Sequence, residues 1–558
     1  MHSATSRPAG RYDVAVVGGG HNGLVCAAYL AAANLRVVVL EKHSRVGGAA
    51  VTEEFHPGFR NSMASYTVSL LQRRVIEELE LAKHGLTIVP RSLANFVPAR
   101  DGRDGKGLAF HRETARMLAA LAEHSPRDAE RYPRFVAELG RVTALFRSLL
   151  LEPPIEPAGG WREHLRALAR LPRIGALGRD GIRTLWDLLA GSAGDWLDRH
   201  FELDPLKGGL GFDAIVGHFA SPYHPGSGYL LLHHSLGEVN GIEGAWGHAI
   251  GGMGAISAAL EKAAKARGVE IFCDAEVTRI DPQAGGCEIE TSLGTVRADA
   301  VAAGVHPRVL FERLLPRDAL PDDFRERIAH WRSESASFRV NVALSELPDF
   351  TCAPGRELAE HHTAGILITP SLDYLAAAYV DARRDGYSAA PVVELLIPST
   401  VDPTLAPAGA HVASLFCQHF RRHLPDGTHW SDAKQAALDR VIDTVTEYAP
   451  NFRRSIVAAQ AYTPEELETR FGLVGGDIFH GALTLDQLYW ARPAWGYAQY
   501  RTPAPRVYLC GSGAHPGGGV SGAPGHNAAR AMLEDWRGLH ARAQPPGKVR
   551  LPSVTRRP

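Results

Sequence analysis

One stretch of sequence, residues 12–50, constrains the fold of this chain more than any other. It reads YDVAVVGGGHNGLVCAAYLAAANLRVVVLEKHSRVGGAA, in which a β-branched run ends on Gly18 and a later apolar run ends on Glu41. A segment rich in Ala and Leu lies between them, as expected for a helix that packs on a sheet. Strand, tight turn, helix and strand in this order predict an α/β fold with a Rossmann-like dinucleotide-binding domain.

The glycines of this stretch fit the pattern G-x-G-x-x-G at Gly18, Gly20 and Gly23. We expect the first to make the sharp turn, the second to let a pyrophosphate approach the backbone, and the third to let the helix pack closely on the strand. The helix N-terminus offers free N–H groups to the phosphates. Glu41 is placed to accept hydrogen bonds from ribose hydroxyls. A dinucleotide site is therefore favoured over a plain Gly-rich turn.

The residues after this acid indicate which dinucleotide is bound. They read E-K-x-x-x-x-G-G, from Glu41 and Lys42 to Gly47 and Gly48. This segment resembles the second fingerprint of FAD-binding flavoproteins of the amine-oxidase type, where it passes along the flavin and its diphosphate. An NAD-binding domain requires no Gly-Gly pair at this place, so the resemblance implies FAD.

Length and composition exclude several classes of protein. A chain of 558 residues exceeds the usual size of one hydrophobic core, so more than one domain is expected. A net charge of −1 gives no global reason to expect a nucleic-acid partner. The six cysteines form no C-x-x-C pair, which argues against a redox disulfide or a zinc site and favours a reducing compartment. No apolar run reaches the roughly 20 residues that span a bilayer, so we expect a cytoplasmic protein, with peripheral membrane contact as an open alternative.

Changes of periodicity along the chain predict its domain organisation. We expect a substrate domain of α+β type, with a helical cap, to be inserted into the dinucleotide-binding domain. The predicted FAD-binding parts are residues 12–75, 245–306 and 475–540, the substrate parts are 76–244 and 307–474, and the ends are a disordered N-terminus (1–11) and a C-terminal tail (541–558).

An arginine-rich amphipathic region follows the breaking pairs Pro153-Pro154 and Gly159-Gly160. Its sequence, WREHLRALARLPRIGALGRDGIRTLWDLL, is compatible with a helix on a membrane surface or against a partner. We favour the alternative of a helical cap whose arginines face solvent.

A second unusual stretch, residues 221–254, is dense in Gly, His and aromatic residues. Its histidines do not follow a metal-ligand spacing such as H-E-x-x-H, and no acids accompany them at suitable positions. We therefore predict no metal site and expect these histidines to be hydrogen-bonded in the core or to line a pocket. They are His218, His224, His233, His234 and His248.

Residues 506–527, RVYLCGSGAHPGGGVSGAPGHN, carry the second glycine-rich signature. So many glycines between a strand and a helix suggest a backbone pressed against a flat or charged ligand. Here the chain resembles the phytoene desaturase-like FAD-dependent oxidoreductases, whose signature is a strand followed by G-x-G-T-H-P-G-x-G. Ala514 stands where that family more often has Thr or Ser, and His526 departs from its usual small residue. Matches at GGGHNGL, HAIGGMGAISAAL and LDQLYWARPAWGYAQYRTP extend the resemblance over the whole chain.

This resemblance implies an FAD-binding domain assembled from three separated segments. The backbone of Val277 is expected to meet the adenine. No second complete G-x-G-x-x-G with its strand and acid follows, so a separate NAD(P) domain is not expected and reoxidation is assigned to O2, a quinone or another acceptor. The remaining residues expected to hold FAD are Gly18, Gly20, His21, Asn22, Gly23, Glu41, Lys42, Gly47 and Gly48 at the ADP and diphosphate part, with Gly511, Ser512, Gly513, Gly519 and Val520 beside the ribityl chain and ring.

Catalysis is expected to come from the flavin, with the protein orienting the substrate. We expect a desaturase or dehydrogenase that passes a hydride from a small apolar substrate, isoprenoid- or polyene-like, to flavin N5. His515 is the first catalytic candidate, against a histidine that only fixes the glycine loop. Arg492 is the second, as an anchor for substrate or reduced flavin, against a structural ion pair. Asp477, His480 and Asp486 are weaker candidates.

Other functions remain open at this stage. An amine oxidase-type reaction would need a pocket polar enough for an amine. A flavoprotein without net redox chemistry would be an isomerase, or an interaction protein with a vestigial site. Oligomeric state and substrate identity are not defined by these patterns.

Overall fold

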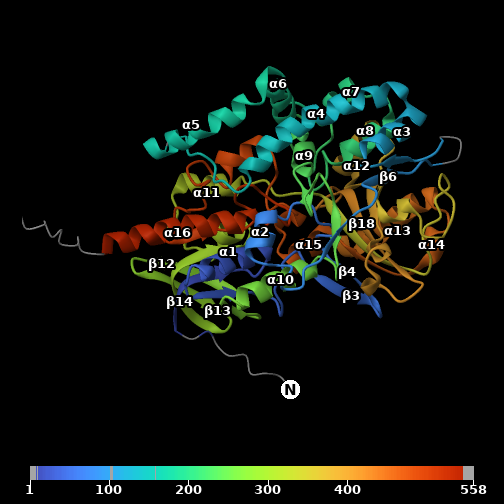
Figure 1. The fold of residues 1–558 in the computed structure, drawn as a ribbon. Helices are drawn as coiled ribbons and strands as arrows, with labels where there is room; N and C mark the ends of the chain where they lie inside the picture. Colours follow the sequence, from blue (N-terminus) through green and yellow to red (C-terminus); the bar gives the residue numbers. More distant parts are fainter. Residues whose placement is uncertain (1–7, 9, 101–104, 158, 544–558) are drawn as a thin grey trace, which may run out of the picture.

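The structure is a computed structural model that describes residue 8 and residues 10–100, 105–157 and 159–543 (Figure 1). Most of the predicted disordered segment 1–11, and residues 544–558 of the predicted tail, lie outside the described residues. Two predicted limits need correction, because Arg11 already belongs to the first strand and the last helix extends to Ala543.

A seven-stranded sheet forms the dinucleotide-binding part of the molecule. Its order is β11-β2-β1-β14-β13-β12, and β20 pairs with residues 301–303 of β14, beyond the stretch of β14 that pairs with β13. Neighbouring strands pair in parallel except at β13, which pairs antiparallel with both β14 and β12. The strands are β1 (Arg11–Val17), β2 (Val37–Leu40), β11 (Glu270–Phe272), β12 (Val277–Gln283), β13 (Gly286–Thr291), β14 (Gly294–Ala303) and β20 (Val507–Leu509).

The parallel strands of this sheet end in register. Val17 of β1 pairs with Leu40 of β2 on one side and with Ala303 of β14 on the other. Ala303 in turn pairs with Leu509 of β20. The chain therefore leaves all these strands at one edge of the sheet, which is where ligands bind in open α/β folds.

Three helices cover this sheet and close its core. Helix α1 (His21–Ala32) contacts both α10 (Gly254–Lys265) and α16 (Ala523–Ala543). Ten of its residues are buried and few are charged, because both of its sides meet other elements. Strands and helices from the beginning, middle and end of the chain thus share one hydrophobic core.

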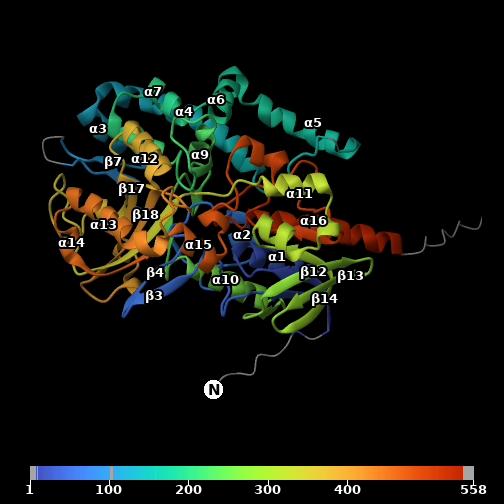
Figure 2. The same cartoon turned by 180° about the vertical axis from the view of Figure 1, so that it is seen from behind.

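A second sheet lies beside the first and belongs to the inserted part of the chain (Figures 1 and 2). Its order is β19-β15-β18-β17-β16-β6-β7, and α12 (Leu372–Asp385) and α13 (Trp430–Tyr448) pack against β17. The strands are β6 (Asn95–Val97), β7 (Leu108–Phe110), β15 (Ser337–Leu344), β16 (Gly365–Ile368), β17 (Tyr387–Leu396), β18 (His411–Phe420) and β19 (Ile456–Tyr462).

A layer of helices runs along the edge of the molecule that is uppermost in Figure 1. It is the predicted helical cap. With the two sheets it confirms the predicted class, an α/β fold with a Rossmann-like domain and an inserted α+β domain. The helices are α3 (Thr114–His124), α4 (Pro126–Leu149), α5 (Trp161–Gly175), α6 (Gly178–Ala190), α7 (Ala193–His200), α8 (Asp204–Phe212) and α9 (Ser227–His234).

Short elements join these layers. The stretch after the Gly-Gly pair begins with the hairpin of β3 and β4. The remaining named elements are β3 (Thr52–His56), β4 (Phe59–Ser62), α2 (Arg73–Glu78), β5 (Ile88–Pro90), β8 (Glu238–Val239), β9 (Ile242–Glu243), β10 (Gly247–Ala249), α11 (Asp322–Ala329), α14 (Phe452–Ser455) and α15 (Pro464–Phe471).

One prediction about the cap is wrong. The arginines of α5 do not all face solvent, because Arg170 and Arg173 turn inward and pair with Glu152 at 3.1 and 3.0 Å. The leucines of this helix are exposed instead. Periodicity defines the two faces of a helix but not which of them meets the protein.

None of the described helices has the length and hydropathy to cross a bilayer. The described residues also hold no group of three or more His, Cys, Asp or Glu side chains arranged for a metal ion.

Candidate functional site

A cavity of about 640 Å³ opens at the carboxyl edge of the parallel sheet and continues to the second sheet. At one end it is lined by the turn after β1, by the end of β2 and by Val277. At the other end it is lined by Tyr66, Trp246 and Phe416, the last from β18. A ligand that fills it would touch both the dinucleotide-binding domain and the inserted domain.

The first glycine turn fits a phosphate group at this cavity. Gly20, the N-cap of α1, has a φ of −68°, and a Cβ built there would meet no atom within 4 Å. Gly23 differs, because its Cβ would lie 2.2 Å from the carbonyl oxygen of Gly18. The open side of Gly20 and the first N–H groups of α1 therefore form a cradle for an anion, as the sequence predicts.

Glu41 lies at the cavity wall and is held there by backbone groups. Its two carboxylate oxygens accept hydrogen bonds from the N–H of Gly19 at 2.7 Å and of His43 at 2.9 Å. A carboxylate has about four lone-pair sites, so it can still accept hydrogen bonds from ribose hydroxyls. Lys42 and Val277 line the same end.

The C-terminal glycine loop reaches the same cavity from the opposite end of the sequence. It begins directly after β20, and Ser512, Gly519 and Val520 line the cavity. Two hydrogen bonds tie it to the N-terminus of α1. Asn22 donates through Nδ2 to the hydroxyl of Ser512 at 3.2 Å, and Nε2 of His21 lies 3.2 Å from the carbonyl oxygen of Gly519. The two glycine-rich bends therefore converge in space.

Three of the residues predicted to hold FAD do not line the cavity but pack behind it. The N–H of Gly47 donates to the carbonyl of Gly19 at 2.9 Å. A Cβ on Gly511 would lie 2.6 Å from the carbonyl oxygen of Gly304, and one on Gly513 would lie 2.3 Å from Pro307. These glycines allow close approach of chain to chain, and their neighbours in the loops face the ligand.

Arg492, a predicted catalytic residue, is fully buried and does not line the cavity. Its guanidinium donates to the carbonyl oxygens of Ser512 at 2.7 Å and Phe479 at 2.8 Å. Three further carbonyls, of Gly481, Ala482 and Gln487, accept at 3.2 to 3.4 Å. Burial lowers the pKa of Arg492 to about 10, opposed by nearby Asp477, so it stays charged at neutral pH. Within the described part of the chain Arg492 makes no ion pair, and its hydrogen bonds fix the glycine loop to the chain around residues 479–487.

His515, the other predicted catalytic residue, is also buried and absent from the cavity lining. Its ring lies 5.3 Å from the ring of Tyr489, and its Nε2 has no hydrogen-bond partner among the described residues. Burial lowers the pKa of His515 to about 3, opposed by a hydrogen bond to the backbone of Leu149. This placement fits a histidine that shapes the glycine loop better than it fits one that contacts the flavin ring.

The weaker candidates have separate positions. The Asp477 carboxylate is buried and accepts from Ser335 and from the N–H groups of Phe479 and Gly481. Asp486 pairs at the surface with Arg332, at 2.7 Å. Of the three, only His480 lines the cavity.

The far end of the cavity is mainly apolar and aromatic. Its polar exceptions include Tyr66 and His234. The rings of Tyr66 and Phe416 stack with their centroids 5.2 Å apart. The apolar lining residues at this end are Leu70, Val216, Trp246, Phe416, Ile478 and Phe479.

A buried charged network lies behind Tyr66, and sequence reasoning missed it. The Tyr66 hydroxyl donates to Glu394 at 2.5 Å, and Glu394 lies 3.7 Å from Arg91. The guanidinium of Arg339 sits over the Tyr66 ring at 4.5 Å. Burial, and then the charge of Glu394, raise the pKa of Asp213 to about 7, although Arg91 opposes them. The sequence feature that could have indicated this network is a charged residue within a mainly apolar strand, Glu394 in β17 and Arg339 in β15.

His234 presents a defined tautomer to this end of the cavity. Its Nδ1 lies 2.8 Å from the carbonyl of Asp213 and 3.0 Å from that of Leu230, so Nδ1 carries the proton and Nε2 is left as an acceptor. Burial lowers the pKa of His234 to about 4. The same cause lowers the pKa of His21 to about 4 and that of His480 to about 3. These cavity histidines are therefore neutral at pH 7.

Comparison with known proteins agrees with this geometry. Residues 23–337 match the family described as flavin containing amine oxidoreductase. The pyridine nucleotide-disulfide oxidoreductase domain-containing protein 2 of Rattus norvegicus is 40% identical over 547 residues, which cover 95% of this chain and 94% of that relative. The resemblance expected from the glycine signatures is thereby confirmed.

More distant relatives extend over nearly the whole chain as well. A limonene dehydrogenase subunit of Castellaniella defragrans is 26% identical, covering 94% of each chain. A phytoene desaturase (lycopene-forming) of Pseudescherichia vulneris is also 26% identical, covering 93% of this chain and 99% of its own. Among solved structures, a triple mutant of putrescine oxidase has the same fold with a TM-score of 0.58 at 16% identity, covering 95% of this chain and 99% of that one.

Proposed function

Because this chain belongs to the flavin-containing amine oxidoreductase family, its cofactor is FAD, and we propose that it is a dehydrogenase or desaturase of an apolar substrate. The reaction removes two hydrogens from adjacent carbons of an isoprenoid- or polyene-like molecule. The observation that carries this proposal is the apolar and aromatic far end of the cavity. Transfer of an apolar substrate from water to such walls lowers its free energy, which favours binding.

The charges behind that wall support a neutral substrate over an amine. Two guanidinium groups, of Arg91 and Arg339, accompany two carboxyl groups, of Glu394 and Asp213. Since the pKa of Asp213 is near 7, part of its negative charge is lost at neutral pH. The network is thus not net negative, and it offers no attraction to a cationic amine.

The names of two relatives agree with this proposal. One belongs to a limonene dehydrogenase and the other to a phytoene desaturase, and both names describe removal of hydrogen. Removal of hydrogen from an apolar molecule is what we propose for this chain.

The roles of the protein follow from the placement of its residues. Bound FAD supplies a two-electron acceptor for the hydride that leaves the substrate. Leu70, Trp246 and Phe416 hold the substrate and exclude water, which sets the distance and angle of the reacting carbon. His234 offers the neutral Nε2 as an acceptor for a hydrogen bond or for the departing proton. Arg492 and His21 keep the two glycine loops in place.

An anaerobic reduction experiment tests the proposal. The purified holoprotein is mixed with terpene or polyene hydrocarbons in detergent, or with primary amines, while the flavin absorbance is followed without oxygen. We expect bleaching by a hydrocarbon and none by the amines. Bleaching by amines alone would assign an amine oxidase-type reaction. Product formed without bleaching and without any added acceptor would assign an isomerase.

A variant of the cavity wall adds a control to this experiment. Phe416→Asp places a carboxylate at the apolar end, where a bound hydrocarbon would have to displace the water that solvates the charge. We expect the flavin content to stay near that of the wild type while the rate of bleaching falls at least about tenfold. A control that introduces aspartate at an exposed apolar site, Val457→Asp, should leave the rate unchanged.

A further inference from the structure

Helix α5 is an amphipathic helix that turns its apolar face away from the protein. Leu165, Leu168 and Leu171 are each more than half exposed, and Trp161 at the start of the helix is 69% exposed. No described residue of α5 is buried. On the next helix, α6, Trp186 is 71% exposed. In a soluble helix the apolar face normally packs on the core.

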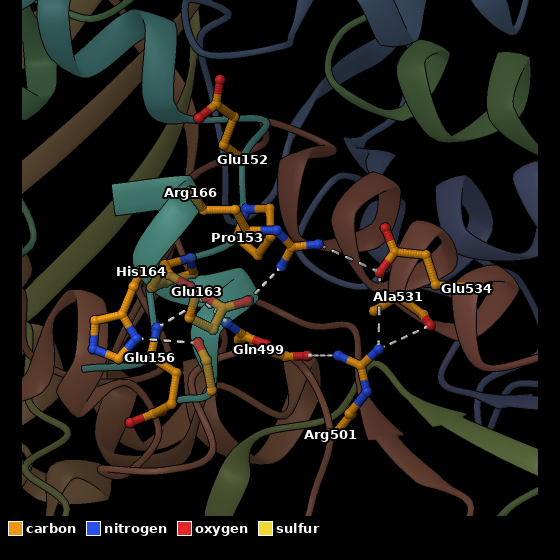
Figure 3. Close-up of polar contacts among 12 residues, drawn as sticks. Glu152, Pro153, Glu156, Glu163, His164, Arg166, Gln499, Arg501, Ala531 and Glu534 are labelled. Atoms are coloured by element: carbon orange, nitrogen blue, oxygen red, sulfur yellow. Dashed lines mark hydrogen bonds and ion pairs between the residues drawn. The ribbon is translucent and has the colours of Figure 1, made fainter. Parts of the chain in front are cut away.

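The polar face of α5 is fastened to the protein (Figure 3). Glu163 accepts hydrogen bonds from Gln499 at 2.9 Å and from Arg166 at 2.7 Å, and Arg166 lies 4.0 Å from Glu534 of α16. Arg170 donates to the carbonyl of Pro153 at 2.8 Å. Rotation of the helix to bury its leucines would break these contacts. The outward direction of the apolar face is therefore a property of the fold.

Exposed apolar side chains concentrated along one helix mark an interaction surface. We call the outer face of α5 and α6 the apolar ridge, which consists of Trp161, Leu165, Leu168, Leu171, Ile182 and Trp186. In Figures 1 and 2 these two helices lie at the outer border of the cap, so a flat partner can approach them.

We propose that the apolar ridge docks on the surface of an anionic lipid bilayer, with α5 lying in the interface plane. Residues 161–190 contain six arginines and three carboxylates, whereas the whole chain has a net charge of −1. A tryptophan stands near each end of the ridge, and Trp is enriched where membrane and water meet. Basic residues beside an apolar face attract anionic headgroups.

A second feature supports this choice of lipid. A cavity of about 580 Å³ lies between the polar face of α5 and the C-terminal helix, and its charged lining residues are mainly arginines with two glutamates. Arg147, Arg166, Arg173 and Arg530 are among them. Arg147, Arg166 and Arg173 already pair with glutamates, so a headgroup phosphate at the margin of α5 would compete with those carboxylates for the guanidinium groups. A second copy of this chain is a poorer partner, because it would bring one basic patch against another.

Flotation with lipid vesicles tests the proposal on the full-length holoprotein. The vesicles contain phosphatidylcholine alone, or equal parts of phosphatidylcholine and phosphatidylglycerol. We expect the wild type to float with the anionic vesicles and the double variant Leu165→Glu/Leu168→Glu to bind them at least about tenfold more weakly. The variant should keep its flavin absorbance and melting temperature, because these side chains are exposed.

A matched control is the double variant Leu358→Glu/Val380→Glu, which changes two equally exposed apolar residues elsewhere. It should float like the wild type. The proposal fails if both double variants float equally, if the wild type binds neutral vesicles as well as anionic ones, or if it does not float. Sedimentation without lipid adds one further test. If the wild type and the control variant are dimers and the α5 variant is a monomer, the apolar ridge is assigned to contact with a second copy of this chain. None of these results depends on the substrate, so the proposed function can fail independently.

Discussion

Two glycines three residues apart in the first turn have opposite surroundings. Gly20 faces open space at the cavity, whereas a side chain on Gly23 would overlap the Gly18 carbonyl oxygen at 2.2 Å. The first position is constrained by the ligand and the second by the fold. Substitutions at the two sites should therefore fail in different ways.

We predict that Gly20→Val folds but binds at least about tenfold less FAD, because its side chain fills the space of the diphosphate. The measurement is the ratio of visible flavin absorbance to protein absorbance. After removal of FAD, the variant and the wild type should unfold at nearly the same urea concentration. Gly23→Ala, by contrast, should lose about 2 kcal/mol of stability through overpacking. Full flavin content in Gly20→Val would contradict the assignment of this turn.

Arg492 gives a second prediction at this scale. Its replacement by lysine keeps the charge but removes the fork that reaches five carbonyl oxygens. We expect Arg492→Lys to lower the free energy of unfolding by about 2–4 kcal/mol, measured by denaturant titration. The control is Arg332→Lys, whose exposed pair with Asp486 should be worth less than about 1 kcal/mol. Equal effects of the two substitutions would refute the structural role of Arg492.

At the scale of elements, α15 links stability to cofactor affinity. Thr463 caps this helix by accepting from the N–H of Glu466, whose side chain accepts from the N–H of Thr463 in return. Glu468, Thr469 and Phe471 of the same helix line the nucleotide end of the cavity. Fraying of α15 should therefore weaken the site.

We predict that Thr463→Ala costs about 1 kcal/mol of stability and also raises the dissociation constant of FAD. Calorimetric titration of the apoprotein with FAD measures the second effect. Ser371→Ala is the control, because Ser371 caps α12 by the same kind of bond to the N–H of Tyr374. Helix α12 contributes no residue to the cavity, so this variant should lose similar stability and bind FAD normally. A normal dissociation constant in Thr463→Ala would exclude the link.

The elements nearest to the glycine motifs were the easiest to predict from sequence. Strand β1, helix α1 and strand β2 follow one another between Arg11 and Leu40 in the order that the sequence predicts, because turn chemistry and periodicity act locally there. The glycine turns and Glu41 could be placed for the same reason. The role of Arg492 could not, since its acceptors are set by the path of two loops. The network of Tyr66, Glu394 and Arg91 joins segments hundreds of residues apart, and no local pattern encodes such contacts.

At the scale of the whole molecule, the Asp213 carboxyl makes stability depend on pH. The pKa of Asp213 is raised from its ordinary value near 3.8 to about 7, first by burial and then by Glu394. Between these two values the folded protein binds more protons at this site than the unfolded chain does. Its contribution to stability therefore falls as the pH rises from about 4 to about 7, and is constant above that.

We predict that Asp213→Asn removes this dependence, because the amide resembles the protonated acid. The free energy of unfolding of the variant, minus that of the wild type, should increase by about 2 kcal/mol between pH 5 and pH 8. The difference between the two proteins cancels the titration of the buried histidines. Urea titrations at the two pH values measure it, and a difference that does not change with pH would show that Asp213 titrates normally.

The position of β20 also affects how this protein is made. The parallel sheet begins with β1 at residues 11–17, yet the only described strand that pairs with one side of Val301–Ala303 in β14 is β20, at residues 507–509. A ribosome must therefore release almost the entire polypeptide before this sheet can close. Until then the nascent chain carries a bare strand edge, the kind of surface that recruits chaperones or aggregates. A premature stop codon before residue 507 would make that transient state permanent.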